Sequence, residues 1–120
     1  SMTCVIVERP MEEDEIGYME LFKRLVAAIP DNCRIETDIT YGTRPAIPVI
    51  FAALTYALRF KFNVEIADVI YGKLDWNVQP PKSYLCDATS LFKLNFLLED
   101  LAAIGGDHPE EAAKLLFGIK

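Results

Sequence analysis

The fold is decided by one stretch, Asp38-Ile-Thr-Tyr-Gly-Thr-Arg-Pro-Ala-Ile-Pro48, which runs directly into Val49-Ile-Phe-Ala-Ala-Leu-Thr-Tyr-Ala-Leu-Arg-Phe60. Residues 34–39 have the composition of a short strand, and residues 40–47 hold a glycine and an arginine. Residues 48–60 are apolar almost all round, and Pro48 fits the first turn of a helix, where its missing N–H costs nothing. The stretch therefore predicts a strand, a polar connection and a buried helix.

This order of elements favours an anion site in the connection. Backbone N–H groups and the positive end of a helix dipole point to one place there, and in open α/β sheets ligands bind at the carboxyl ends of strands. Gly42 permits a close backbone approach, and Arg44 can hold a phosphate through a forked pair of hydrogen bonds. Three hydroxyl side chains can donate as well, those of Thr40, Tyr41 and Thr43. An ordinary strand-to-helix connection explains the same spacing about equally well.

Asp38 differs from its neighbours, because a carboxylate repels an anion. We expect it to hold N–H groups of the connection or to pair with Arg44.

Composition restricts the protein to a few classes. The chain has 120 residues, 52% of them apolar, which predicts one folded domain over residues 3–120 and excludes disorder. A net charge of −6 argues against direct DNA binding or attachment to a membrane surface. Cys4, Cys33, Cys86 and the single His108 lack the spacing of metal ligands, so we expect no metal site and no cofactor. The odd number of cysteines and the lack of a signal peptide predict free thiols and a cytoplasmic protein.

Patterns on either side of the central stretch predict the remaining elements. Strands are expected at residues 3–7, 64–71 and 84–87, and a long polar loop at residues 72–83. Helices are expected at residues 12–28, from Thr89 or Ser90 to about Ile104, and from Pro109 onward.

The alternation of strands and helices predicts an α/β fold, a Rossmann-like, mostly parallel sheet with flanking helices. No helix separates the last two strands, so the last strand is free to pair antiparallel. The all-round apolarity of residues 48–60 predicts a helix covered on more than one side, by another layer of this chain or by a second subunit.

Three motifs in series resemble those of CRISPR-associated Rossmann-fold (CARF) proteins. They are Asp38-Ile-Thr-Tyr-Gly-Thr-Arg-Pro45, Ile70-Tyr-Gly-Lys73 at a strand end, and Leu85-Cys-Asp-Ala-Thr89 before a leucine-rich helix. One branch of that family has a D-x-T-H-G-x-R motif followed by an apolar helix, a strand ending in Tyr-Gly, and a strand leading to an Asp-(Leu)-Thr turn. The order and approximate spacing match over residues 12–104, the second, C-terminal half of such a domain.

The resemblance implies that the chain binds a cyclic oligoadenylate, the second messenger of type III CRISPR systems, as a homodimer. Carried over by position, the ligand-binding residues are Asp38, Thr40, Tyr41, Gly42, Thr43, Arg44, Tyr71, Gly72 and Lys73. Some CARF proteins pass the signal to a fused ribonuclease domain, often HEPN, and some cleave the ring slowly themselves. No HEPN pattern of arginine and histidine is present around His108.

Two departures from the family pattern leave alternatives open. Tyr41 stands where the branch usually has histidine, which removes a possible proton carrier. The resemblance also begins partway into the domain, so the chain is either an incomplete domain from a longer protein or a shortened stand-alone protein. The chain is then a ligand-binding module, a ring nuclease that uses Arg44, Lys73 and the hydroxyls of the connection, or an α/β domain whose apolar helix is an oligomer interface. No catalytic constellation is visible in the sequence.

Overall fold

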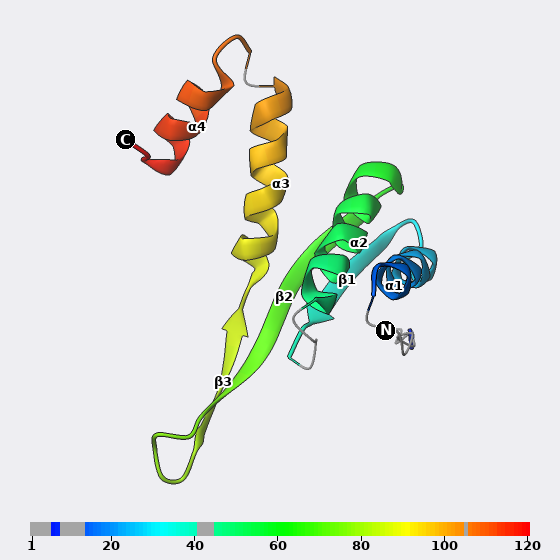
Figure 1. Cartoon of the computed structure of the whole chain (residues 1–120), viewed down its shortest axis with the longest axis vertical. Coiled ribbons are helices and arrows are strands. Elements are labelled where there is room, and N and C mark those ends of the chain that lie inside the picture. Colours follow the sequence, from blue (N-terminus) through cyan, green and yellow to red (C-terminus); the bar gives the residue numbers. More distant parts are fainter. Residues whose placement is uncertain (1–5, 8–13, 41–44, 105) are drawn as a thin grey trace. The chain divides into compact units, whose positions relative to one another are not determined.

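The computed structural model describes residues 6–7, 14–40, 45–104 and 106–120, which belong to two compact units. The first unit spans Ser1–Asp87 and the second Ala88–Lys120. Figure 1 labels the helices and strands of both.

The first unit has an α/β fold, as predicted. Its elements are α1 (Glu15–Ala28), β1 (Cys33–Asp38), α2 (Ala46–Phe60), β2 (Val64–Asp75) and β3 (Lys82–Asp87). The strands form a sheet of order β1-β2-β3, in which β1 and β2 are parallel and β2 and β3 antiparallel. The Rossmann-like β1-α2-β2 crossover and the antiparallel pairing of the last strand are therefore confirmed. The sheet combines one parallel and one antiparallel pair of described strands.

The helix α1 begins where a carboxylate can cap it. Asp14 is the N-cap, and its Oδ1 accepts a hydrogen bond from the Gly17 N–H at 2.8 Å. The helix therefore begins at Glu15, three residues after the predicted residue 12. The strand expected at residues 3–7 falls mostly outside the described residues, and Ile6 and Val7 belong to no strand.

The two turns that precede β1 and β2 are hydrogen-bonded to each other. Asn32 and Asn63 adopt positive φ angles of 54° and 53°, which asparagine tolerates better than most residues. The Asn32 N–H donates to the Phe62 carbonyl at 2.8 Å, and the Phe62 N–H donates to Asp31 Oδ1 at 2.7 Å. These bonds fix the register of the parallel pair from its first partners, Cys33 and Val64.

The helix α2 contacts both α1 and β2, so its all-round apolarity has the predicted consequence of cover on more than one side. Ala53, Leu54 and Ala57 are buried on α2, and the alanines allow close approach. The Phe22 ring of α1 meets the Tyr56 ring of α2 edge-on, with centroids 6.0 Å apart.

The strand β2 is longer than the sequence predicted, and the expectation of a polar loop over residues 72–83 was wrong. Tyr71 to Asp75 continue the strand and pair with β3, whose first residue is Lys82. The connecting turn is therefore only residues 76–81, with a cis peptide bond between Gln79 and Pro80. Residues 70–75 and 82–87 are hydrogen-bonded to each other and form a hairpin.

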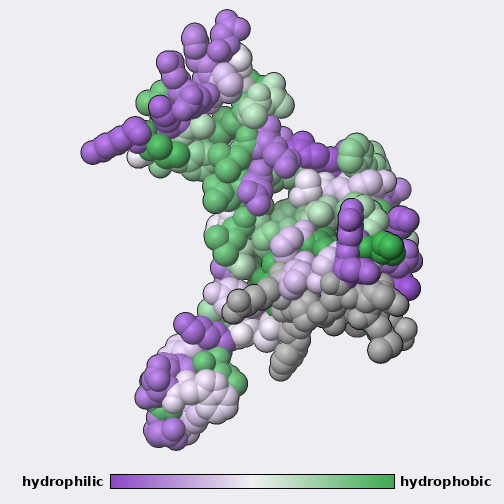
Figure 2. All heavy atoms as spheres, viewed as in Figure 1, coloured by the Kyte–Doolittle hydropathy of each residue, from purple (hydrophilic) through white to green (hydrophobic). Residues whose placement is uncertain are grey.

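The second unit is a helical hairpin made of α3 (Thr89–Ile104) and α4 (Pro109–Phe117), close to the predicted helices. Pro109 lies in the first turn of α4, and Gly118 ends it with a φ of 66°. Figure 2 shows hydrophobic side chains gathered on the visible surface of this unit. Several of its leucines are exposed, among them Leu91, Leu94, Leu97, Leu98, Leu115 and Leu116.

Among the described helices, none is both long enough and apolar enough to cross a membrane.

Candidate functional site

The candidate site lies where β1 ends. Ile39 continues the ladder for one more residue, because its N–H donates to the Ile70 carbonyl of β2 at 2.8 Å. Asp38 Oδ1 then accepts hydrogen bonds from both the N–H and the hydroxyl of Thr40, the first at 2.9 Å. A carboxylate that binds the backbone two residues ahead turns the chain away from the strand direction. Asp38 therefore holds an N–H group of the connection, one of its two expected roles.

The Thr40 hydroxyl joins two of the segments that the sequence singled out. Besides donating to Asp38, its Oγ1 accepts the Gly72 N–H at 2.7 Å. This N–H lies beyond the end of β1, so the side chain of Thr40 takes the place of the next strand residue. A Cβ on Gly72 would lie 3.5 Å from the Thr40 side chain, an ordinary van der Waals distance.

The other predicted ligand-binding residues divide into two groups. Tyr41, Gly42, Thr43 and Arg44 lie outside the described residues. Gly72 and Lys73 were expected just after a strand that ends at Tyr71, and this was wrong. Tyr71, Gly72 and Lys73 all lie within β2, opposite Cys86, Leu85 and Tyr84.

Asp38 is held as a carboxylate by its neighbour. The hydroxyl of Thr40, and then its backbone N–H, stabilise the charged form and lower the pKa of Asp38. Because the folded-state pKa is lowered, this contribution to stability is present above the ordinary pKa of aspartate. It is lost as the pH falls through the lower folded-state value.

A tyrosine and a cysteine meet across the two antiparallel strands. Tyr71 is the direct partner of Cys86, and the hydrogen bond between their side chains raises the pKa of the Tyr71 hydroxyl. Cys33 and Cys86 are free thiols, and Cys4 lies outside the described residues.

The helix α2 begins at the same end of β1. Its N-cap is Pro45 and its first residue is Ala46, so the helix starts two residues earlier than the predicted Pro48. Pro48 still lies in the first turn, as its lack of an N–H requires. The connection thus begins at Thr40, bonded to β2, and ends at the N-terminus of α2.

No group of three or more histidine, cysteine or acidic side chains that could hold a metal is found among the described residues.

The sequence interpretation missed Tyr84 and Cys86 as candidates for this site. They lie opposite Lys73 and Tyr71 in the antiparallel pair, so they share a face of the sheet with two predicted ligand residues. A hairpin assignment over residues 71–87 would have found them. The available signal was the pair Pro80-Pro81 between two short stretches rich in tyrosine and lysine.

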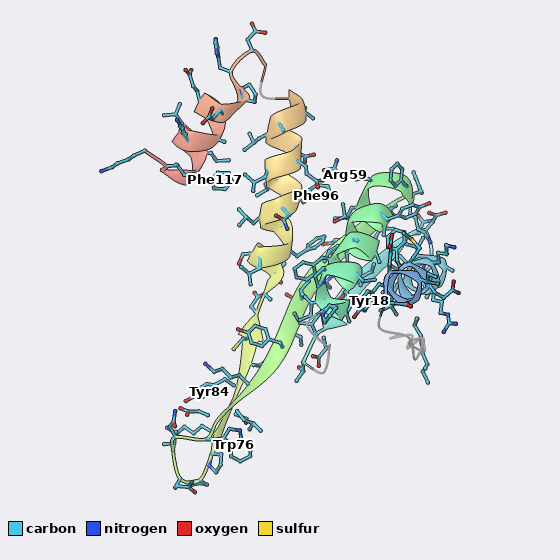
Figure 3. All side chains as sticks on the ribbon, in the orientation of Figure 1. Tyr18, Arg59, Trp76, Tyr84, Phe96 and Phe117 are labelled. Atoms are coloured by element: carbon cyan, nitrogen blue, oxygen red, sulfur yellow. The ribbon has the colours of Figure 1, made fainter. Side chains whose placement is uncertain are left out.

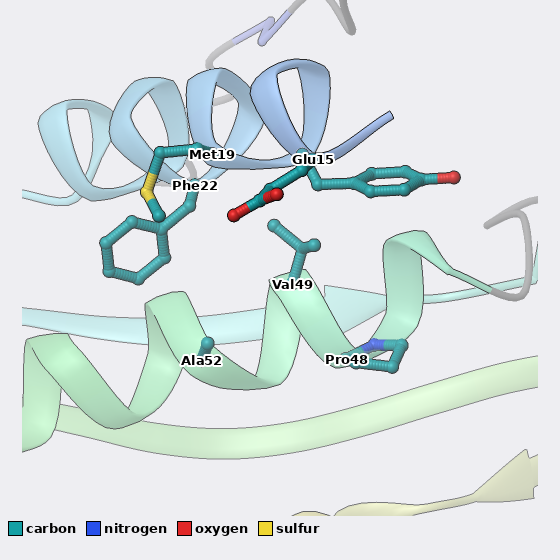
Figure 4. A pocket seen from close by; sticks show the side chains of 7 residues that line it. Glu15, Met19, Phe22, Pro48, Val49 and Ala52 are labelled. Atoms are coloured by element: carbon teal, nitrogen blue, oxygen red, sulfur yellow. The ribbon is translucent and has the colours of Figure 1, made fainter. Parts of the chain in front are cut away.

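Apart from this site, a groove lies between α1 and α2 (Figure 4). It is an open groove of about 680 Å³, mostly apolar, and it is lined by Glu15, Tyr18, Met19, Phe22, Pro48, Val49 and Ala52. Its polar groups are few and do not converge on a point, unlike those around Thr40, so we do not assign it a ligand.

Replacing Thr40 with valine tests the junction between the connection and β2. Valine keeps the shape but can neither donate to Asp38 nor accept from Gly72. We expect the pKa of Asp38 to rise toward its ordinary value, measured by NMR titration of the side-chain carboxyl carbon. The matched control is Thr55→Val, which removes a hydroxyl that donates to the Phe51 carbonyl within α2 at 2.9 Å. An unchanged Asp38 pKa in Thr40→Val would contradict the hydrogen-bonding scheme.

Comparison with known proteins gives one distant relative. The chain is 27% identical to the CRISPR-associated protein MJ1674 of Methanocaldococcus jannaschii over 93 residues. These cover 77% of this chain but only 14% of that protein, so the chain spans a small part of its relative. No family model and no solved structure matches. The similarity supports an association with CRISPR systems, whereas the CARF branch and its D-x-T-H-G motif stay predictions.

Proposed function

We propose that the chain is part of a CRISPR-associated sensor of a type III system, which binds a cyclic oligoadenylate as a homodimer. The observation that carries the proposal is the hydrogen bond from the Gly72 N–H to the Thr40 hydroxyl. It brings together two of the three motifs that resemble CARF proteins, the connection after β1 and the Tyr-Gly-Lys segment of β2. The similarity to a CRISPR-associated protein supports the same assignment.

The chemistry of this place suits a phosphodiester ring. The connection carries hydroxyls and Arg44, it ends at the N-terminus of α2, and Lys73 is exposed on the strand beside it. Hydrogen bonds from arginine and from backbone N–H groups to a phosphate are charge-assisted and therefore strong. The net negative charge of the whole chain does not prevent phosphate binding, because a local group of hydrogen-bond donors is enough to hold one small anion.

Incubation with radiolabelled cyclic tri-, tetra- and hexa-adenylate tests the proposal directly. We expect one ring size to bind and to be recovered intact, and sedimentation to show a dimer. Recovery of a linear product would favour the ring nuclease instead. If none of the rings binds, the chain is not a sensor of this ligand, and an α/β oligomerisation domain becomes the better description.

A further inference from the structure

The two-stranded ribbon formed by β2 and β3 beyond the end of β1 has one face rich in tyrosine and lysine. The ladder between β1 and β2 ends with Asp38 opposite Ile70, so residues 71–75 pair only with residues 82–86 among the described strands. Figure 1 shows this ribbon continuing past the carboxyl end of β1. Among the described strands, the other edge of residues 71–75 is therefore not paired with a third strand.

Strand register determines which side chains share a face of the ribbon. Tyr71 lies opposite Cys86, Lys73 opposite Tyr84, and Asp75 opposite Lys82. Directly opposed residues of antiparallel strands point to the same side. The six side chains of these three pairs therefore share one face, and we call it the tyrosine–lysine face.

This face continues a row of β2 side chains that includes the buried Val69. Val69 is fully buried, and α2 contacts β2. Side chains two residues apart on a strand point the same way, so Tyr71 and Lys73 extend the row that Val69 begins. The helix α2 starts at Ala46, after the carboxyl end of β1.

The central pair of this face, Lys73 and Tyr84, supplies an ammonium group and an aromatic ring, which can bind the phosphate and the base of a nucleotide. Tyr84 is 47% exposed, and Lys73 is exposed opposite it. Figure 3 shows Tyr84 on the ribbon, away from the helices of the first unit. An aromatic ring can stack on a nucleobase, and an ammonium group beside it can contact a phosphate of the same strand. No ion-pair partner of Lys73 is present in the described part of the chain.

We propose that Tyr84 stacks on an adenine base of the ligand while Lys73 contacts the adjoining phosphate. This inference rests on the proposed function and extends its site from the connection after β1 onto the ribbon. The ligand is an adenylate chain, recognised through the flat face of a base as well as through its charge.

A purely structural role for Tyr84 predicts different behaviour. A tyrosine opposite a lysine also stabilises a hairpin, because its ring packs against the aliphatic stem of its neighbour. In that case its replacement would lower stability but leave the optical signal of a bound base unchanged. The test therefore needs a signal that reports stacking itself.

The experiment uses the ring that wild type binds, with 2-aminopurine in place of one adenine, together with the matching linear oligoadenylate. We expect 2-aminopurine fluorescence to be quenched on binding to wild type. Tyr84→Ala should weaken binding roughly 5- to 150-fold, the effect of losing one stacked base, and should remove most of the quenching. Tyr84→Phe should keep both, because the phenyl ring stacks as well. The control is Leu85→Ala, which removes a side chain that is 72% exposed on the other face.

The outcomes separate this inference from the proposed function. If the ring binds and Tyr84→Ala changes neither affinity nor quenching, the inference is wrong and the sensor assignment stands. If only the linear oligoadenylate binds, with Tyr84-dependent quenching, the ribbon contact is supported and the cyclic ligand is excluded. If neither oligoadenylate binds to wild type, both proposals are overturned. Circular dichroism of each variant shows whether a loss of binding reflects a loss of folding.

Discussion

Replacing Arg44 with alanine is expected to weaken binding of the cyclic oligoadenylate by about 1.5–3 kcal/mol, the range for hydrogen bonds to charged groups. That corresponds to a dissociation constant roughly tenfold to more than a hundredfold higher. The physical reason is the position of Arg44 in the sequence, between Thr40, which is bonded to β2, and Pro45, the N-cap of α2. Calorimetric titration of wild type and variant measures the change.

Two further variants show whether the effect is specific. Arg44→Lys should recover only part of the lost affinity, because lysine keeps the charge but not the forked pair of donors. Arg34→Ala removes an exposed arginine near the start of β1, at the opposite end of the strand from the connection, and should leave the affinity unchanged. Binding of Arg44→Ala as tight as that of wild type would mean that the connection has no phosphate-binding role.

The second large effect is expected in the core. Leu21 is 6% exposed on α1, the helix that packs against α2. Leu21→Ala should lower the free energy of unfolding by about 2–5 kcal/mol, because it removes buried methyl groups and leaves a cavity. Urea denaturation followed by circular dichroism gives the value.

The same helix supplies the matched control. Ile16 is an isomer of leucine and is 79% exposed, so Ile16→Ala removes the same number of carbon atoms from the surface. It should change the free energy of unfolding by no more than about 0.5 kcal/mol. Equal losses from the two substitutions would show that α1 is not packed as described.

Helices and buried strands were the predictable part of this fold, because burial on one side leaves a periodic pattern. The three- and four-residue spacing of Ile16, Met19, Phe22, Leu25, Val26 and Ile29 predicted α1. Ile16 and Met19 of that pattern are nevertheless largely exposed, and the buried Leu21 lies outside it. The ribbon at residues 71–87 has no buried side, so its sequence lacks the alternation that marks a half-buried strand. That is why Gly72 to Ser83 was taken for a loop.

The sequence predicted the position of the candidate site only as well as it predicted where the strands end. The resemblance to CARF proteins assigned the residues after β1 and Gly72 to one ligand site, and the structure joins Thr40 and Gly72 by a hydrogen bond. Binding of a ligand there stays a prediction. The sequence could not predict that Tyr84 lies opposite Lys73, because cross-strand register depends on the length of the turn between the strands. It also left two roles open for Asp38, and the bonds to Thr40 show one of them.

Among the described strands, Ile70 is the one residue of β2 that is paired on both sides, with Asp38 of β1 and Asp87 of β3. The two ladders of the sheet therefore meet end to end along β2 instead of overlapping. If β3 separated from β2, from the pair Asp75–Lys82 at the turn back to the pair Tyr71–Cys86, every pair between β1 and β2 would stay intact. The ribbon can therefore open locally at a lower free energy than global unfolding. A ligand that contacts both the connection and the ribbon would slow this opening of residues 71–86.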